Sequence, residues 1–212
     1  MLARRSLLAG LGVLAARPVM AQSTPDRPRV ELRTGQGVIV LELRADKAPV
    51  TTANFLHYVD SRRFDGATFY RATRTPGFEG QGLIEGGLQN ARGKLFPPIA
   101  HESTTMTGLQ HLDGTISMAR YAPGTATADF FICSGPAASL DAQPNAPGDN
   151  TGFAAFGSVV KGMDVVHAIL ALPTPGVARN PVMKGQILDP PVPILAARRA
   201  ASAPPPASAT AT

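Results

Sequence analysis

Four histidines and one cysteine are the side chains of this chain best suited to bind zinc or to act as a strong nucleophile. No two histidines stand four residues apart, as zinc ligands on one face of a helix do. His101-Glu102 begins like a zinc-protease motif, but Thr105 occupies the position of the second histidine. Cys133 follows two phenylalanines and an isoleucine and is interpreted as a buried small side chain. The sequence therefore predicts neither a metal site nor a cysteine nucleophile.

Serine-based hydrolysis and phosphate binding also lack support. Ser117 and Ser134 have no acid or base close to them in the sequence, and no G-x-S-x-G segment occurs. Between Gly87 and Gly93 stand five residues, and Leu95 follows Lys94, whereas a phosphate-binding loop needs four residues between its glycines and then Ser or Thr after the lysine. We therefore expect no nucleotide and no other cofactor.

The composition fits one globular domain with tails. The chain has 212 residues, of which 44% are hydrophobic, so a real core can form. A single cysteine excludes an intramolecular disulfide framework. Three of the five net positive charges come from arginines among residues 1–21, so the remainder is only mildly basic and predicts no nucleic-acid partner.

The first 21 residues have the pattern of a signal peptide. Arg4-Arg5 is followed by an apolar run too short for a stable membrane anchor, and Val19-Met20-Ala21 has the small-residue spacing of a cleavage site. The arginine pair suits a twin-arginine signal or an ordinary secretory one. We expect an exported, periplasmic protein with no stable membrane insertion after cleavage. The predicted organisation is a signal peptide (1–21), a flexible segment (22–28), one domain (29–199) and an Ala/Pro/Ser/Thr tail (200–212).

The elements of the domain follow from hydrophobic periodicity. Alternation around Gly35-Gln36-Gly37 predicts a hairpin over residues 30–43, and helical spacing predicts helices over 49–59 and 162–170. Short apolar segments separated by glycines predict strands between the helices. Residues 192–195 are predicted to form an edge strand, where proline is tolerated. A β-barrel or sandwich closed by two helices is expected.

Three parts of the sequence together resemble one family, the cyclophilins, which are peptidyl-prolyl cis-trans isomerases. They are residues 42–55; the series Phe69-Tyr70-Arg71, Pro76-Gly77-Phe78 and Gly86-Gly87; and residues 114–120 with 129–133, 140–141 and 156–166. The resemblance extends over residues 30–195. It implies a mainly β fold, a closed eight-stranded antiparallel β-barrel capped by two α-helices, with an active groove on its outer surface and no metal or cofactor.

The resemblance also implies the residues of that groove. Arg71 matches the catalytic arginine, and Phe131 and Leu140 match an apolar socket for the proline ring, completed by Leu83 or Phe78. The backbone at Ala119 and Arg120 is expected to pair with the substrate main chain. The further substrate-binding residues are Glu85, Asp129 and Phe153.

Several of these positions differ from the family pattern. Either Gln81 or Glu85 takes the place of a substrate-binding glutamine, and Glu85 is preferred because Leu83 and Ile84 supply a strand in front of it. Asp129 replaces a glutamine, Arg120 an asparagine and Phe153 a histidine. Ser139 stands near the position of a tryptophan that contributes to cyclosporin binding, so weak cyclosporin sensitivity is expected.

The function implied is acceleration of X-Pro rotation in folding proteins by a monomer whose partners are proline-containing polypeptides. The alternative is a non-catalytic peptide-binding chaperone on the same fold.

Overall fold

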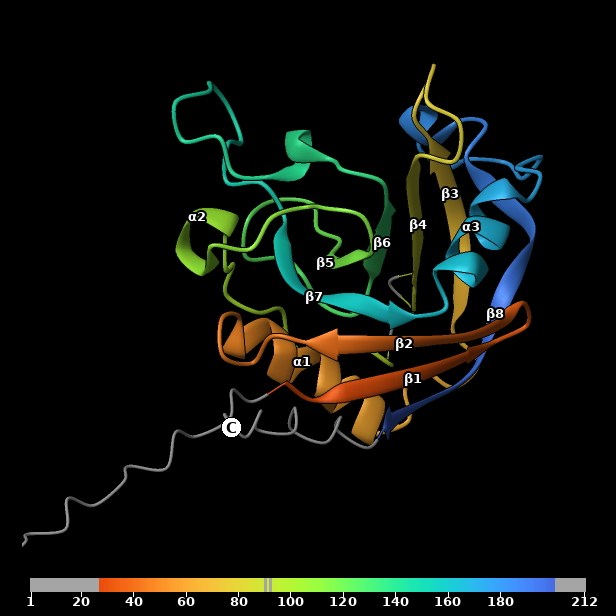
Figure 1. Ribbon diagram of the computed structural model, residues 1–212, viewed down its shortest axis with the longest axis horizontal. Coiled ribbons are helices and arrows are strands. Elements are labelled where there is room, and N and C mark those ends of the chain that lie inside the picture. Colours follow the sequence, from red (N-terminus) through yellow and green to blue (C-terminus); the bar gives the residue numbers. More distant parts are fainter. Residues whose placement is uncertain (1–26, 90, 92, 201–212) are drawn as a thin grey trace, which may run out of the picture.

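Eight strands form where the sequence alternates between apolar and polar residues or carries short apolar segments (Figure 1). The structure is a computed structural model and describes residues 27–89, 91 and 93–200. The strands are β1 (Arg29–Thr34), β2 (Gly37–Leu43), β3 (Thr68–Arg74), β4 (Gly82–Gly87), β5 (Thr115–Met118), β6 (Phe130–Ser134), β7 (Ala154–Lys161) and β8 (Ile187–Ala200). The predicted signal peptide, most of segment 22–28 and tail residues 201–212 lie outside the described residues.

The strands close into an antiparallel barrel in the order β1-β2-β7-β5-β6-β4-β3-β8, with β8 also paired to β1. This confirms the predicted barrel and excludes the sandwich. The prediction of an edge strand at 192–195 is wrong, because β8 is 14 residues long and has a partner on each side. Its pairing with β3 jumps from Val192 to Ile187, so Pro190 and Pro191 fall where no ladder hydrogen bond is required.

Three helices occur in the described residues: α1 (Pro49–Asp60), α2 (Thr104–Thr107) and α3 (Met163–Ala171). The two predicted helices are α1 and α3. In Figure 1, α1 lies beneath the barrel, where it contacts β7 and β8, and α3 contacts β2, β3 and β4. None of the helices in the described ranges has the length and apolar character to cross a bilayer.

Helix α1 receives its N-terminal cap from a distant loop. Pro49 begins the helix, and Ala48 before it has no side chain that could cap. Instead the buried carboxylate of Glu102 accepts hydrogen bonds from the amides of Val50 (3.1 Å) and Thr51 (2.7 Å). A carboxylate at this end also interacts favourably with the helix dipole, so Glu102 fixes the loop and the helix together.

Aromatic rings fill the interior of the barrel. Phe130 points inward from β6 and contacts Phe55, Phe64 and Phe69 with ring centroids 5.3 to 5.8 Å apart. Each fully buried phenylalanine contributes about 1.5–3 kcal/mol of transfer free energy. Because side chains occupy the inside, a substrate site has to lie on the outer surface.

Candidate active site

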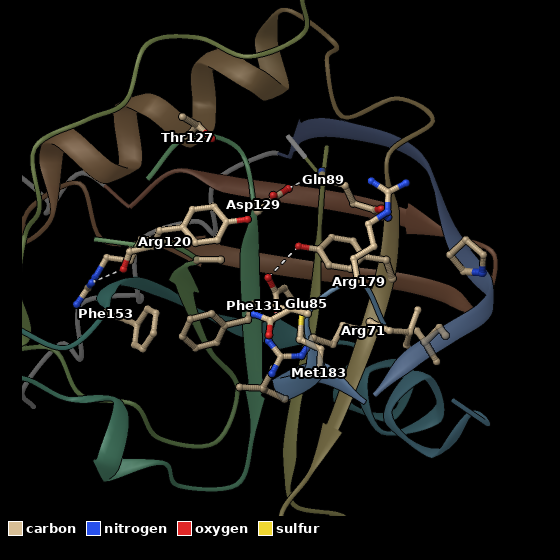
Figure 2. Close-up of a pocket in the computed structure, with 18 of the residues that line it drawn as sticks. Arg71, Glu85, Gln89, Arg120, Thr127, Asp129, Phe131, Phe153, Arg179 and Met183 are labelled. Atoms are coloured by element: carbon tan, nitrogen blue, oxygen red, sulfur yellow. Dashed lines mark hydrogen bonds and ion pairs between the residues drawn. The ribbon is translucent and has the colours of Figure 1, made fainter. Parts of the chain in front are cut away.

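A groove of about 730 Å³ lies on the outer face of the barrel, over β3, β4 and β6 (Figure 2). The structure brings all nine predicted site residues to its lining: Arg71, Leu83, Glu85, Ala119, Arg120, Asp129, Phe131, Leu140 and Phe153. Twelve further residues complete the lining: Tyr70, Gln89, Tyr121, Thr125, Thr127, Val177, Arg179, Asn180, Met183, Ile187, Leu188 and Pro191. Most of these twelve lie in loops without a periodic pattern, so the sequence carried no signal for them.

A bulge in β3 turns two successive side chains toward the groove. Phe69 pairs with Gly86 and Arg71 with Glu85, so Tyr70 is an extra residue in the ladder. Phe69 is buried in the core, whereas Tyr70 and Arg71 both line the groove. Regular alternation would have sent Tyr70 and Arg71 to opposite faces of the strand.

Glu85 joins these two side chains. Its Oε2 accepts a hydrogen bond from Nη1 of Arg71 at 2.7 Å, and its Oε1 accepts one from the Tyr70 hydroxyl at 2.8 Å. Burial, together with the adjacent Glu85 carboxylate, raises the pKa of the Tyr70 phenol well above its usual value, so the phenol keeps its proton and donates. Both oxygens of Glu85 are thus used within the protein, which makes it a support for Arg71.

The apolar part of the groove centres on Phe131. Strand alternation on β6 places Phe131 outward and Phe130 inward, as predicted. The rings of Phe131 and Phe153 meet edge to face with centroids 5.4 Å apart. Leu83 lines the same groove, whereas Phe78, the alternative considered from the sequence, is 59% exposed on the loop before β4 and outside the lining. Gln81 is likewise outside it.

Arg120 uses its side chain to hold a loop. Its guanidinium donates to both carboxylate oxygens of Asp149 (2.6 and 2.9 Å) and lies 5.0 Å from the centre of the Phe153 ring. Hydrogen bonding from Arg120 holds the pKa of Asp149 well below its usual range. The side chain of Arg120 is only 4% exposed, so it fixes residues 149–153 at the edge of the groove.

Asp129 and Ala119 also make internal contacts. The Asp129 carboxylate accepts the backbone N–H of Gln89 at 2.9 Å, and the carbonyl of Asp129 accepts the N–H of Ala119 at 2.9 Å. The Ala119 N–H is therefore not the group that could pair with a substrate main chain. The absence of a side chain at Gly87 makes room for Asp129, because a Cβ at Gly87 would lie 2.3 Å from Oδ1 of Asp129.

Behind Phe131 lies a hydrogen-bonded array that the sequence did not reveal. Nδ1 of His111 lies 2.6 Å from Asp141 Oδ1, and its Nε2 lies 2.9 Å from the Ser117 hydroxyl. Ser117 therefore has a base beside it, since His111 stands six residues earlier in the chain, and the fold adds the more distant Asp141. The Ser117 side chain is fully buried and His111 is 1% exposed, so the hydroxyl cannot reach a substrate.

This array supports the floor of the groove. The His111 and Phe131 rings stack with centroids 5.8 Å apart and an interplanar angle of 17°. Asp141 directly follows Leu140, another lining residue. Burial lowers the pKa of His111 although Asp141 opposes the shift, so the imidazole is neutral at pH 7. Cys133, on the neighbouring part of β6, is buried as predicted, and burial raises the pKa of its thiol to about 12.

No group of three or more His, Cys, Asp or Glu side chains in the described part of the chain is arranged to hold a metal ion. The groove instead offers the half-buried guanidinium of Arg71, aromatic and aliphatic walls, and hydrogen-bonding groups on its rim. Such a site can bind an extended peptide with an apolar ring and direct an N–H donor at its backbone.

Comparison with known proteins identifies the family. Residues 29–192 match the model of the cyclophilin type peptidyl-prolyl cis-trans isomerase/CLD family. The chain is 37% identical to a peptidyl-prolyl cis-trans isomerase of Acinetobacter baylyi over 82% of its own length and 85% of the relative's. It is 38% identical to peptidyl-prolyl cis-trans isomerase A of Dickeya dadantii, over 79% and 83% of the two chains.

Solved structures confirm the fold. A cyclophilin-type isomerase from Cryptosporidium parvum superposes with a TM-score of 0.64 at 19% identity, covering 83% of this chain and 99% of that one. A second structure of that protein, obtained in the presence of the dipeptide Ala-Pro, gives the same TM-score of 0.64 at 20% identity and covers 82% and 99% of the two chains. With the family model and the bacterial relatives, these results show that the chain belongs to the cyclophilin-type peptidyl-prolyl cis-trans isomerases.

Proposed function

We propose that this chain accelerates cis-trans rotation of X-Pro bonds in folding polypeptides, with Arg71 as its catalytic residue. The observation that carries the proposal is the position of Arg71, held by Glu85 at 2.7 Å on the wall of a groove that also contains Phe131. Family membership supports the activity, because the bacterial relatives bear the name of that enzyme.

The reaction needs no covalent step. Amide resonance holds the X-Pro bond planar with a barrier of about 18–20 kcal/mol, so rotation without a catalyst takes tens to hundreds of seconds. As the bond twists, the prolyl nitrogen loses conjugation and regains a lone pair. A donor aimed at that nitrogen binds the twisted state more strongly than either planar one, which lowers the barrier.

Arg71 is suited to this task. A guanidinium is permanently charged and has several donors, so one N–H can hold a backbone carbonyl while another faces the nitrogen. Phe131 and Leu83 provide apolar surface for the proline ring, and Leu140 and Phe153 extend it. Because a proline ring in such a socket cannot turn freely, rotation is confined to the part of the peptide on the other side of the bond.

The test is isomerisation of a short Ala-Pro-Phe peptide by residues 22–212. Arg71→Ala is expected to lower kcat/KM by about 10²–10³-fold, the usual loss when one transition-state donor is removed. Arg33→Ala is the matched control, because this exposed arginine on β1 pairs with Glu31 away from the groove. If the folded wild-type protein gives no acceleration, the catalytic proposal fails and peptide binding without catalysis replaces it.

We also propose that the protein acts after export, in the periplasm of a bacterium. The support is the pattern of residues 1–21, with its paired arginines and its Val19-Met20-Ala21 ending. N-terminal sequencing of the protein recovered from the periplasmic fraction should begin at Gln22. Replacing Arg4 and Arg5 by lysine should block export if the twin-arginine route is used. Recovery of the full-length chain from the cytoplasm alone would contradict export.

A further inference from the structure

Gln186, in the segment between α3 and β8, contacts the proposed catalytic arginine directly. Its Oε1 accepts a hydrogen bond from Nε of Arg71 at 2.8 Å and a second one from the Thr73 hydroxyl at 2.8 Å. Its Nε2 donates to the carbonyl of Val182 at 3.1 Å. No pattern in the sequence singles out this residue, because it stands 115 positions from Arg71 in a segment without periodicity.

The side chain of Gln186 is fixed in one orientation. Two donors, from Arg71 and Thr73, face its oxygen, and a carbonyl faces its nitrogen. Turning the amide over would set its N–H groups against Arg71 and leave the Val182 carbonyl beside an oxygen. The backbone is anchored as well, since the carbonyl of Gln186 accepts the N–H of Ala72 at 2.9 Å.

Two contacts on different nitrogens determine the plane of the Arg71 guanidinium. Glu85 holds Nη1 on the β4 side, and Gln186 holds Nε on the β8 side. In the described part of the chain, Nη2 donates to no protein acceptor, which leaves its N–H groups for a substrate in the groove. A long arginine side chain fixed in this way does not have to lose its conformational freedom when the X-Pro bond twists.

The neutral character of Gln186 matters too. The carboxylate of Glu85 already compensates part of the Arg71 charge, and the Arg71 side chain is only 19% exposed. An amide oxygen orients the guanidinium without adding a second negative charge. The positive charge that stabilises the twisted amide is thereby kept at the groove.

We propose that Gln186 is a positioning residue for prolyl isomerisation, which acts by orienting Arg71; this inference rests on the proposed function. It predicts that loss of the Gln186 oxygen lowers kcat much more than it changes KM. It also predicts that the effect depends on the presence of Arg71.

The experiment compares two substitutions of similar size. Gln186→Met removes the acceptor and keeps the length of the side chain, so the fold is preserved, whereas Gln186→Glu keeps an acceptor for Arg71 and Thr73. Measured by NMR exchange on an Ala-Pro peptide, Gln186→Met should lower kcat by roughly tenfold to a hundredfold with KM nearly constant. Gln186→Glu should recover part of the loss. Gln36→Ala, at the exposed turn between β1 and β2, is the matched control.

Two further measurements separate positioning from a general structural effect. The Nε–H of Arg71 should give a slowly exchanging NMR signal in the wild type that disappears in Gln186→Met. In an Arg71→Ala background, Gln186→Met should cause no additional loss of kcat. An unchanged kcat in the single variant, or an equal loss in both backgrounds, would overturn the role of Gln186. An inactive wild-type protein would instead overturn the proposed function, so the two failures are distinguishable.

Discussion

Protonation of His111 should destabilise the protein below pH 6.5. The imidazole is buried and neutral, with Asp141 at Nδ1 and Ser117 at Nε2, and its pKa in the folded state lies below that of an unfolded chain, which is about 6.5. Between these two values the unfolded chain binds more protons than the folded one. The free energy of unfolding therefore falls as the pH decreases through this range.

The size of this decrease in the free energy of unfolding is set by the titration of one proton. The slope contributed by a single group cannot exceed about 1.4 kcal/mol per pH unit, and it approaches this value once the unfolded chain is protonated and the folded one is not. Carboxylates that are paired in the native state, such as Asp46, Asp60 and Asp65, have lowered pKa values and lose their contribution at lower pH. As the pH is lowered, the effect of His111 should therefore account for most of the first decrease in the free energy of unfolding, before the carboxylates become protonated.

The assay is urea unfolding at pH steps from 7.5 to 5.0, for the wild type and for His111→Gln. The variant should be less stable at pH 7.5, because it loses the hydrogen bonds of His111, and its stability curve should lack the slope that His111 provides. Ser134→Ala is the matched control: Ser134 is a buried serine whose hydroxyl bonds the Gly80 carbonyl, so its loss should lower stability and leave the pH slope intact. Equal slopes in the wild type and His111→Gln would refute the reasoning, because His111 would then bind protons equally in the folded and unfolded chains, and a slope of opposite sign would indicate that the folded protein holds a charged His111 paired with Asp141.

The remaining predictions concern neighbouring residues with different tasks. Phe130→Ala should cost about 3–5 kcal/mol in urea unfolding because it leaves a cavity among core rings, whereas Phe131→Ala should cost less stability and mainly raise KM for proline peptides; the reverse order would contradict their assignment to core and groove. Asp149→Ala should leave thermal stability almost unchanged and weaken peptide binding only slightly in an NMR titration, since Arg120 keeps its hydrogen bonds to the Thr151 hydroxyl and the Gly152 carbonyl beside Phe153; a large loss of binding would argue against this. Glu102→Gln should lower stability by about 0.5–2 kcal/mol through loss of the charged cap on α1, with activity preserved, and a thermal scan would show it.

The parts of the fold that the sequence made predictable depend on local pattern. The alternation in residues 30–43 determined a hairpin, and adjacent Phe130 and Phe131 had to face opposite sides of a strand. Strand β8 was predicted only in part, because Pro190, Pro191 and Pro193 interrupt its alternation and its two neighbours, β1 and β3, lie more than 100 positions earlier in the chain. Closure of a barrel is a long-range property that no local window contains.

The candidate site also contains residues that local motifs predicted and residues that they did not. Arg71, Phe131 and Leu140 could be named because the motifs around them match a family, and all three reach the groove. Gln186 and His111 could not be named, since their importance comes from partners 115 and 30 positions away. Neither the residue type nor its neighbours in the sequence distinguishes such a residue from an ordinary loop glutamine or a buried histidine.

A barrel whose interior is filled with phenylalanine rings leaves only its outer face for chemistry, and a long arginine side chain on that face has many rotamers unless its neighbours hold it in one. The bulge at Tyr70 helps to hold Arg71, because it directs Tyr70 and Arg71 toward the same carboxylate, that of Glu85. The segment before β8 adds a second contact to Arg71 through Gln186, and the segment around His111 supports Phe131 by ring stacking. The donor and the apolar socket are therefore each held by groups outside their own strand, and loss of those groups should impair catalysis before it unfolds the barrel.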